Sequence, residues 1–85
     1  MALQIVTATL GGREFEVEAA VDGVTYRGAV PAEVLDDQLG AEAAQRDREA
    51  WILGNAPGIE TALVEKSAGR RVIEPFDRIE LRETL

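Results

Sequence analysis

Carboxylates are the side chains whose type and spacing in this sequence come closest to doing chemistry. Glu14, Glu16 and Glu18 recur at every second residue, so a strand would present all three on one face. Two carboxylates can act as general acid and general base where an apolar pocket raises the pKa of one of them. The surrounding sequence indicates no such pocket. We therefore interpret the three glutamates as the solvated face of a strand.

A second acidic group, Asp36 and Asp37 with Glu33 one turn earlier, offers the oxygen ligands that hard cations take. The spacing is not that of an EF-hand loop, and consecutive residues of a helix point in different directions. The pattern favours an exposed helix face over a metal site. We expect neither a metal nor a cofactor.

Basic residues gather where the sequence predicts the end of a helix, at Lys66, Arg70 and Arg71, and they recur at Arg78 and Arg82. Cations near a helix C-terminus are stabilised by the helix dipole, which explains the cluster without a ligand. The alternative is a local patch for an anion or an acidic partner. No phosphate-binding loop pattern accompanies the cluster.

Composition excludes the chemistries that need cysteine or histidine, because the 85-residue chain has neither. The 16 acidic and 9 basic side chains give a net charge of −7, which opposes binding to nucleic-acid phosphates. No apolar run reaches the roughly 18 residues that span a bilayer, and no basic segment of a signal peptide is present. We expect one cytoplasmic domain over 1–85 that binds neither nucleic acid nor membrane.

Residues 15–30 predict a β-hairpin. Apolar and acidic side chains alternate up to the turn Asp22-Gly23, and the alternation resumes after it. The register fixed by that turn places Glu18 opposite Arg27 on the solvated face.

The glycine pair at 11–12 would close an earlier hairpin and pair Val6 with Val17. Leu3 and Ile5 would then lie on the face of the three glutamates. Two explanations stay open: an edge strand that is slipped or is covered by the C-terminal strand, or a sheet edge or face that docks another chain. In this register the residues that face the core are Val6, Ala8 and Leu10.

Helix formers and breakers predict three helices, over 31–39, 41–53 and 56–68. A break precedes Pro57, because proline inside a helix costs about 3 kcal/mol and removes a hydrogen bond. Alternation over 77–83 predicts a terminal strand.

The single tyrosine and the single tryptophan, Tyr26 and Trp51, fall on apolar faces together with Ala44 and Ile52. We expect both aromatic side chains in the core, with an interface anchor as the alternative. All these elements predict an α+β domain: an antiparallel three-stranded meander plus a C-terminal strand, with two or three helices packed on one face.

Five segments carry a resemblance to a known family: 21–27 with the Asp-Gly turn, 30–37, 59–62, 66–70 and 78–81. Together they are similar to the small bacterial domains of unknown function grouped as family 1488. The resemblance implies an α+β fold found in Gram-negative bacteria. It implies no activity, ligand or catalytic residue. The stretch 54–58 departs from the family pattern, in which we expect an unbroken helix.

These observations favour a non-enzymatic protein-interaction module whose partner is another protein or a second copy of the chain. The alternative is an acidic inhibitor or nucleic-acid mimic, whose carboxylates over 14–18 and 33–42 would occupy a basic site on a target. A small enzyme that uses carboxylates and Lys66 would need a pocket with a buried Glu or Asp. The candidate interaction residues are Leu3, Ile5, Glu14, Glu16, Glu18, Arg70 and Arg71.

Overall fold

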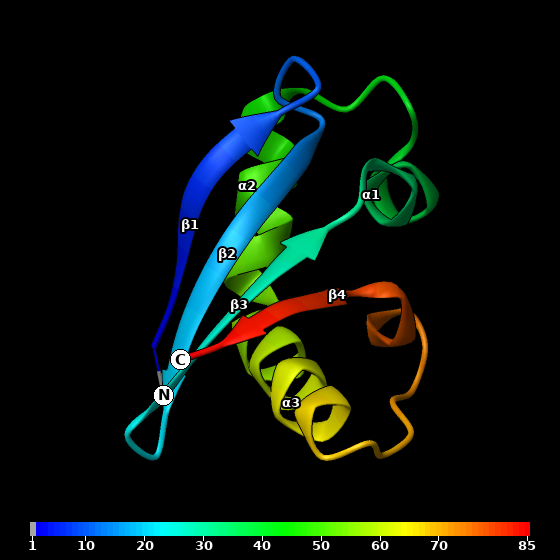
Figure 1. Ribbon diagram of the computed structural model, residues 1–85. Helices are drawn as coiled ribbons and strands as arrows, with labels where there is room; N and C mark the ends of the chain where they lie inside the picture. Colours follow the sequence, from blue (N-terminus) through cyan, green and yellow to red (C-terminus); the bar gives the residue numbers. More distant parts are fainter. Residues whose placement is uncertain (1) are drawn as a thin grey trace.

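The computed structural model describes residues 2–85 and confirms the α+β class (Figure 1). The described residues form four strands, three α-helices and one 3-10 turn. In chain order these are β1 (Ala2–Thr9), β2 (Glu14–Val21), β3 (Val24–Val30), α1 (Ala32–Leu39), α2 (Gln45–Gly54), α3 (Ala56–Ser67), η1 (Phe76–Arg78) and β4 (Glu80–Thr84).

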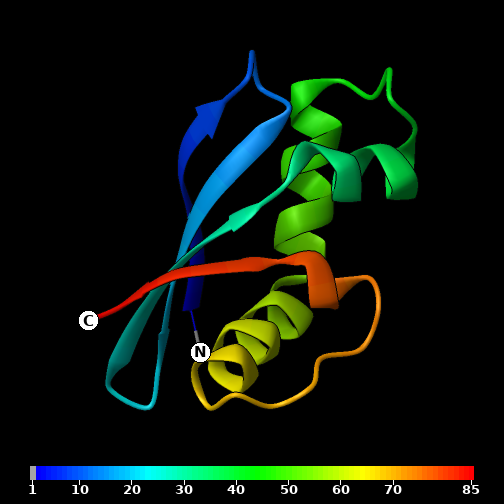
Figure 2. The same ribbon diagram turned by 45° about the vertical axis from the view of Figure 1, so that its right-hand side comes forward.

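The four strands form one antiparallel sheet in the order β1-β2-β3-β4. The three helices lie on one side of it (Figures 1 and 2). β2 shows why the layers separate in this way: Phe15, Val17 and Ala19 are at most 1% exposed, while Glu16 between them is exposed. The core therefore lies between the sheet and the helices, and the opposite face of the sheet carries the polar side chains.

The hairpin of β2 and β3 has the predicted register. Asp22 and Gly23 have φ values of 51° and 80°, the positive values that a two-residue hairpin turn requires. Glu18 lies opposite Arg27, and the carboxylate oxygen Oε2 accepts a hydrogen bond of 2.9 Å from Arg27 Nε. This pairing lies on the polar face, as the sequence predicts.

A bulge in β1 overturns the predicted register of the first hairpin from Val6 back to the start of the strand, whereas Ala8 pairs with Phe15 as a hairpin closed at Gly11-Gly12 requires. Thr7 pairs with Glu16 and Ile5 pairs with Val17, so Val6 is an extra residue without an opposite partner. One extra residue reverses the faces of everything before it. Leu3 and Ile5 therefore pack against the core, and the prediction that they share the glutamate face is wrong.

The residues expected in their place lie in solvent. Val6 is 53% exposed, Leu10 is 66% exposed, and Ala8 is exposed as well. The C-terminal strand does not cover β1 either, because β4 pairs with β3 at the other side of the sheet. A slip in register is thus the explanation of the first strand.

The helices differ from the prediction mainly at their ends. α2 begins at Gln45 and not at residue 41, and Ala44 is exposed and not in the core. The break at Asn55 is confirmed, and its side-chain Nδ2 donates a 2.8 Å hydrogen bond to the Trp51 carbonyl at the end of α2. Gly69 ends α3 with a φ of 72°, in a Schellman motif in which the backbone N–H of Arg70 bonds the Glu65 carbonyl at 2.8 Å.

The C-terminal segment is shorter as a strand than predicted. Residues 76–78 form a 3-10 turn, and β4 begins only at Glu80. Ile79 lies between them and is fully buried. Tyr26 is in the core as predicted, whereas Trp51 is partly buried and its ring centroid lies 6.1 Å from that of Phe76.

We expect Gly28→Ala to destabilise the fold by about 1–3 kcal/mol, the range for an overpacked core position. A Cβ at Gly28 would collide with the Glu80 carbonyl oxygen and lie 2.6 Å from Leu63 Cδ2. Gly54→Ala is the matched control. Gly54 is the last residue of α2, and a Cβ at this position meets nothing within 4 Å. The control should raise the free energy of unfolding by about 0.4–1 kcal/mol. Urea unfolding measures both, and equal effects would contradict the close packing of β3 on β4.

Candidate interaction surface

The two edges of the sheet differ in chemistry. β1 has eight residues, Ala2–Thr9, and none of them is charged. β4 has only five, and three of these are Glu80, Arg82 and Glu83. Within residues 2–85, β1 and β4 are each paired with a neighbouring strand along one side only. Proteins usually protect an edge by shortness, charge, proline or a bulge. β4 is both short and charged, whereas β1 is long and uncharged and has only the bulge at Val6.

The bulge gives the β1 edge its apolar surface. It turns Val6 outward, where this side chain borders a shallow hollow on the polar face together with Glu16 and Arg82. Leu3 and Ile5 are half-buried, with part of each side chain on the core and part at the edge. Of the residues predicted to interact, these two therefore lie at the candidate surface, on the face opposite to the one expected.

A row of polar side chains crosses the open face and ends at this edge. Gln4 Nε2 lies 3.5 Å from Glu18 Oε1, Glu18 accepts from Arg27 at 2.9 Å, and Arg27 Nη1 lies 3.8 Å from Glu83 Oε2. Each contact joins neighbouring strands, from β1 to β4. The hydrogen bond that Arg27 donates to Glu18 is the main cause that raises the pKa of Arg27. The polar face is thus held in place by its own side chains.

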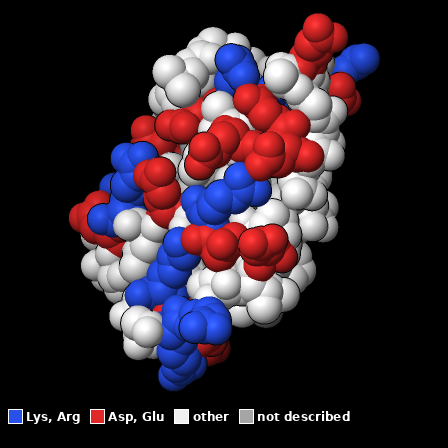
Figure 3. Space-filling view, turned by 90° about the vertical axis from the view of Figure 1, so that its right-hand side faces the viewer, with Lys and Arg blue, Asp and Glu red and all other residues white. Residues whose placement is uncertain are grey.

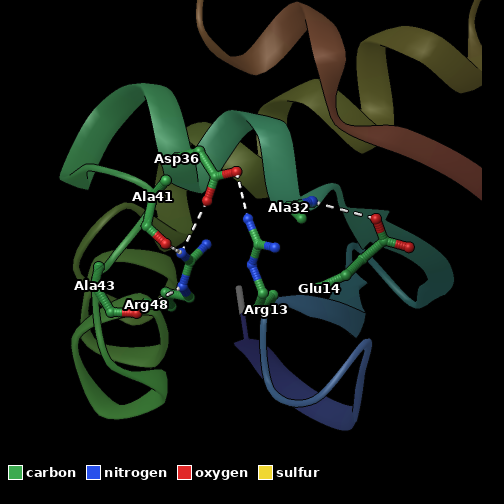
Figure 4. Close-up of polar contacts among 7 residues, drawn as sticks. All are labelled: Arg13, Glu14, Ala32, Asp36, Ala41, Ala43 and Arg48. Carbon is green, nitrogen blue, oxygen red and sulfur yellow. Dashed lines mark hydrogen bonds and ion pairs between the residues drawn. The ribbon is translucent and has the colours of Figure 1, made fainter.

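Glu14, one of the acidic residues predicted to interact, bonds the start of a helix (Figure 4). Glu14 Oε1 accepts a 3.2 Å hydrogen bond from the backbone N–H of Ala32, the first residue of α1. Pro31 contributes no side-chain cap, so this carboxylate from β2 accepts the hydrogen bond of an unpaired N–H group at the start of α1. Its negative charge also interacts favourably with the positive end of the helix dipole. Glu16 alone of the three glutamates has no such polar contact within residues 2–85.

Asp36 lies between two arginines. Its Oδ2 is 2.7 Å from Arg13 Nη2, and its Oδ1 is 2.8 Å from Arg48 Nη2. Arg48 is the larger cause and Arg13 the smaller cause that lowers the pKa of Asp36, against a contrary effect of partial burial. The neighbouring Asp37 pairs with Arg78 at 2.6 Å. Both carboxylates are therefore paired with arginines of the same chain, and the described part of the chain has no cluster of three metal-ligating side chains.

Arg48 is the polar residue that the sequence interpretation missed. It is 1% exposed, it donates to the carbonyls of Ala41 and Ala43, both at 3.0 Å, and it forms an ion pair with Asp36 (Figure 4). These bonds fix the turn before α2 and tie it to α1. A signal was present, because Arg48 precedes the buried Ile52 by four residues and so shares its helix face.

The basic cluster at the end of α3 is divided by its partners. Lys66 Nζ donates to the carbonyl of Asp77 at 2.6 Å, and Arg70 Nη1 lies 3.2 Å from Glu65 Oε2. Arg71 has no hydrogen bond or ion pair among the described residues. Arg70 and Arg71 therefore border the same hollow, as their grouping in the sequence suggests, but only Arg70 is engaged in an ion pair.

One buried acid could have supported the enzyme interpretation. Glu60 is 3% exposed, and its Oε2 has no hydrogen-bond partner in residues 2–85. It lines neither of the two hollows beside α3. Neither of these hollows therefore presents this carboxylate to a substrate. Over the same residues, no helix is long and apolar enough to cross a membrane.

No family model matches this chain, and comparisons with curated proteins and with solved structures also gave no match. The resemblance to family 1488 stays an expectation from the sequence. Residue roles must therefore come from the geometry of this chain alone.

We expect Asp36→Asn to lower the melting temperature most at neutral pH. The ion pairs depress the pKa of Asp36 in the folded state, so their stabilisation is complete above the unfolded value of about 3.9. It is lost as the pH falls through the lower folded pKa. The gap between wild type and variant should therefore narrow below about pH 4. Glu42→Gln is the control, because Glu42 is exposed and forms no ion pair within residues 2–85. A gap that is constant from neutral to acidic pH would contradict the assignment.

Proposed function

We propose that this protein is a non-enzymatic interaction module that binds an extended segment of a partner protein along the edge of β1. The observation that carries the proposal is the contrast between the edges: eight uncharged residues in β1 against the short, charged β4. A long, uncharged edge offers a row of backbone N–H and C=O groups to a further strand. Strand addition of this kind gives affinity through the main chain and specificity through alternate side chains.

The side chains along β1 indicate the chemistry of the partner. A strand added beside β1 would cover the exposed parts of Leu3 and Ile5 on the helix side and would meet Val6 on the open side. The helix side of the edge is therefore apolar, and the open side presents Val6 between the polar residues Gln4 and Thr7. We infer a partner segment with apolar residues on its helix side, an apolar residue opposite Val6 and no charge at its centre.

The acidic mimic is the second candidate, and the ion pairs weaken it. A mimic needs carboxylates that are free to meet a basic site. Glu18, Asp36 and Asp37 each already face an arginine of the same chain, and Glu14 bonds the start of α1. The net charge of −7 remains in its favour.

We expect Thr7→Lys to reduce partner capture by roughly tenfold or more, which corresponds to about 1.4 kcal/mol. Thr7 is exposed and lies opposite Glu16, so a lysine there can pair with this carboxylate and leave the fold intact. The charge would nevertheless oppose a neighbouring strand. The measurement is affinity capture with the tagged full chain from the source organism, quantified by mass spectrometry.

Thr84→Lys is the matched control, because it makes the same change at an exposed position of the β4 edge. It should capture the same protein as wild type, and both variants should keep the wild-type melting temperature. Sedimentation at tens of micromolar identifies a second copy as the partner if wild type is dimeric and Thr7→Lys is monomeric. Capture that Thr7→Lys leaves unchanged contradicts the proposal. Capture that collapses with added salt supports the mimic instead.

A further inference from the structure

A hollow of about 420 Å³ lies between α3 and the loop that follows it, apart from the β1 edge. Its size is within the usual range for small-molecule sites, which is roughly 300–1,000 Å³. Most of its wall is apolar. The apolar residues that form it are Pro57, Gly58, Val72, Ile73 and Phe76.

Gly58 makes room for the wall of this hollow. A Cβ at this position would lie 2.5 Å from Cζ of the Phe76 ring, so only glycine lets that ring approach the backbone of α3 so closely. The ring of Phe76 also lies next to that of Trp51, and the two ring centroids are 6.1 Å apart. Phe76 is therefore fixed between two elements, and the wall that it forms is preformed.

The loop that forms the opposite wall is tied down at both ends (Figure 2). At its start, the backbone N–H of Arg70 bonds the carbonyl of Glu65 at 2.8 Å. At its end, Lys66 Nζ bonds the carbonyl of Asp77 at 2.6 Å, and the backbone N–H of Asp77 bonds the carbonyl of Ile73 at 3.1 Å. The segment between these anchors arches beside α3. Ile73 is left 77% exposed at the rim, where an apolar ligand would cover it.

The charge at the rim decides what kind of apolar ligand fits. Two charged residues border the hollow, Glu65 and Arg71. Glu65 is engaged with Arg70 at 3.2 Å, whereas Arg71 has no ion pair within residues 2–85. Arg71 also borders an adjoining hollow, whose other charged residues are Lys66, Arg70, Glu74 and Asp77. Figure 3 shows basic side chains gathered at this lower end, where α3 ends in Figure 1.

We propose that this hollow binds a small apolar carboxylate, of the class of medium-chain fatty acids. The hydrocarbon chain would lie against Pro57 and Phe76 and cover Ile73, and the carboxylate would bind Arg71. A guanidinium matches a carboxylate through two parallel hydrogen bonds. The anion would thus bind to an acidic protein at the place where a free cation and apolar surface meet. This site is independent of the edge of β1.

The test is a titration of the full chain with octanoate, followed by the fluorescence of Trp51 and by calorimetry. Trp51 is the single tryptophan, and it contacts the ring that lines the hollow, so its emission should respond to the ligand. We expect octanoate to bind at least tenfold more tightly than octan-1-ol, because the alcohol lacks the charge that Arg71 recognises. Arg71→Gln should remove that preference, and Ile73→Ser should weaken both ligands.

Two matched variants control for the loss of charge and of apolar surface. Arg46→Gln removes another exposed arginine without an ion pair in the described chain, and Leu53→Ser removes another exposed apolar side chain, both from α2. Neither residue borders the hollow, so both variants should bind octanoate as wild type does. Absence of binding at millimolar octanoate, equal binding of acid and alcohol, or equal loss in Arg46→Gln would each overturn the proposal.

Discussion

Burial of only one face of the sheet is the constraint on which the rest of this structure depends. β2 sets it, because Phe15, Val17 and Ala19 are buried while the glutamates between them point away. Three short helices suffice to cover that one face. The other face has no covering layer, so it must be stable in water through its own side chains, and the row of contacts from Gln4 to Glu83 supplies that order.

In a domain this small, many charged side chains hold the helices in place. Neither Pro31 nor Ala44 provides a side-chain cap for the helix that follows it. Glu14 satisfies the start of α1 from a neighbouring strand, and Arg48 binds the carbonyls of the turn before α2. A buried guanidinium is costly unless it is paired and hydrogen-bonded, and Asp36 provides the pairing. The acidic composition therefore describes how the helices are held and says little about a partner.

The sequence predicted well where a local rule determines the structure. The turn Asp22-Gly23 fixes both its backbone angles and the register of β2 with β3, and Pro57 fixes the break before α3. The bulge at Val6 was missed because the glycine turn was counted as if the strand were regular. The sequence did contain a signature of the bulge. Apolar side chains fall on odd-numbered residues at Leu3 and Ile5 and on even-numbered residues from Val6 onward, so the alternation changes phase at Val6. Hydrogen bonds between distant segments, such as those of Arg48, have no equivalent local rule.

Function in so small a domain has to come from groups that the fold leaves unused. Six of the nine basic side chains form ion pairs within residues 2–85, namely Arg13, Arg27, Arg48, Arg70, Arg78 and Arg82. Lys66 is bonded to a carbonyl, which leaves Arg46 and Arg71. Of these two, only Arg71 borders an apolar hollow. Unpaired backbone is similarly rare in a compact fold and is concentrated at the sheet edges, and only β1 leaves it without charged neighbours. Within residues 2–85, the β1 edge and the hollow at Arg71 therefore both bring a group that the fold leaves unused beside apolar surface.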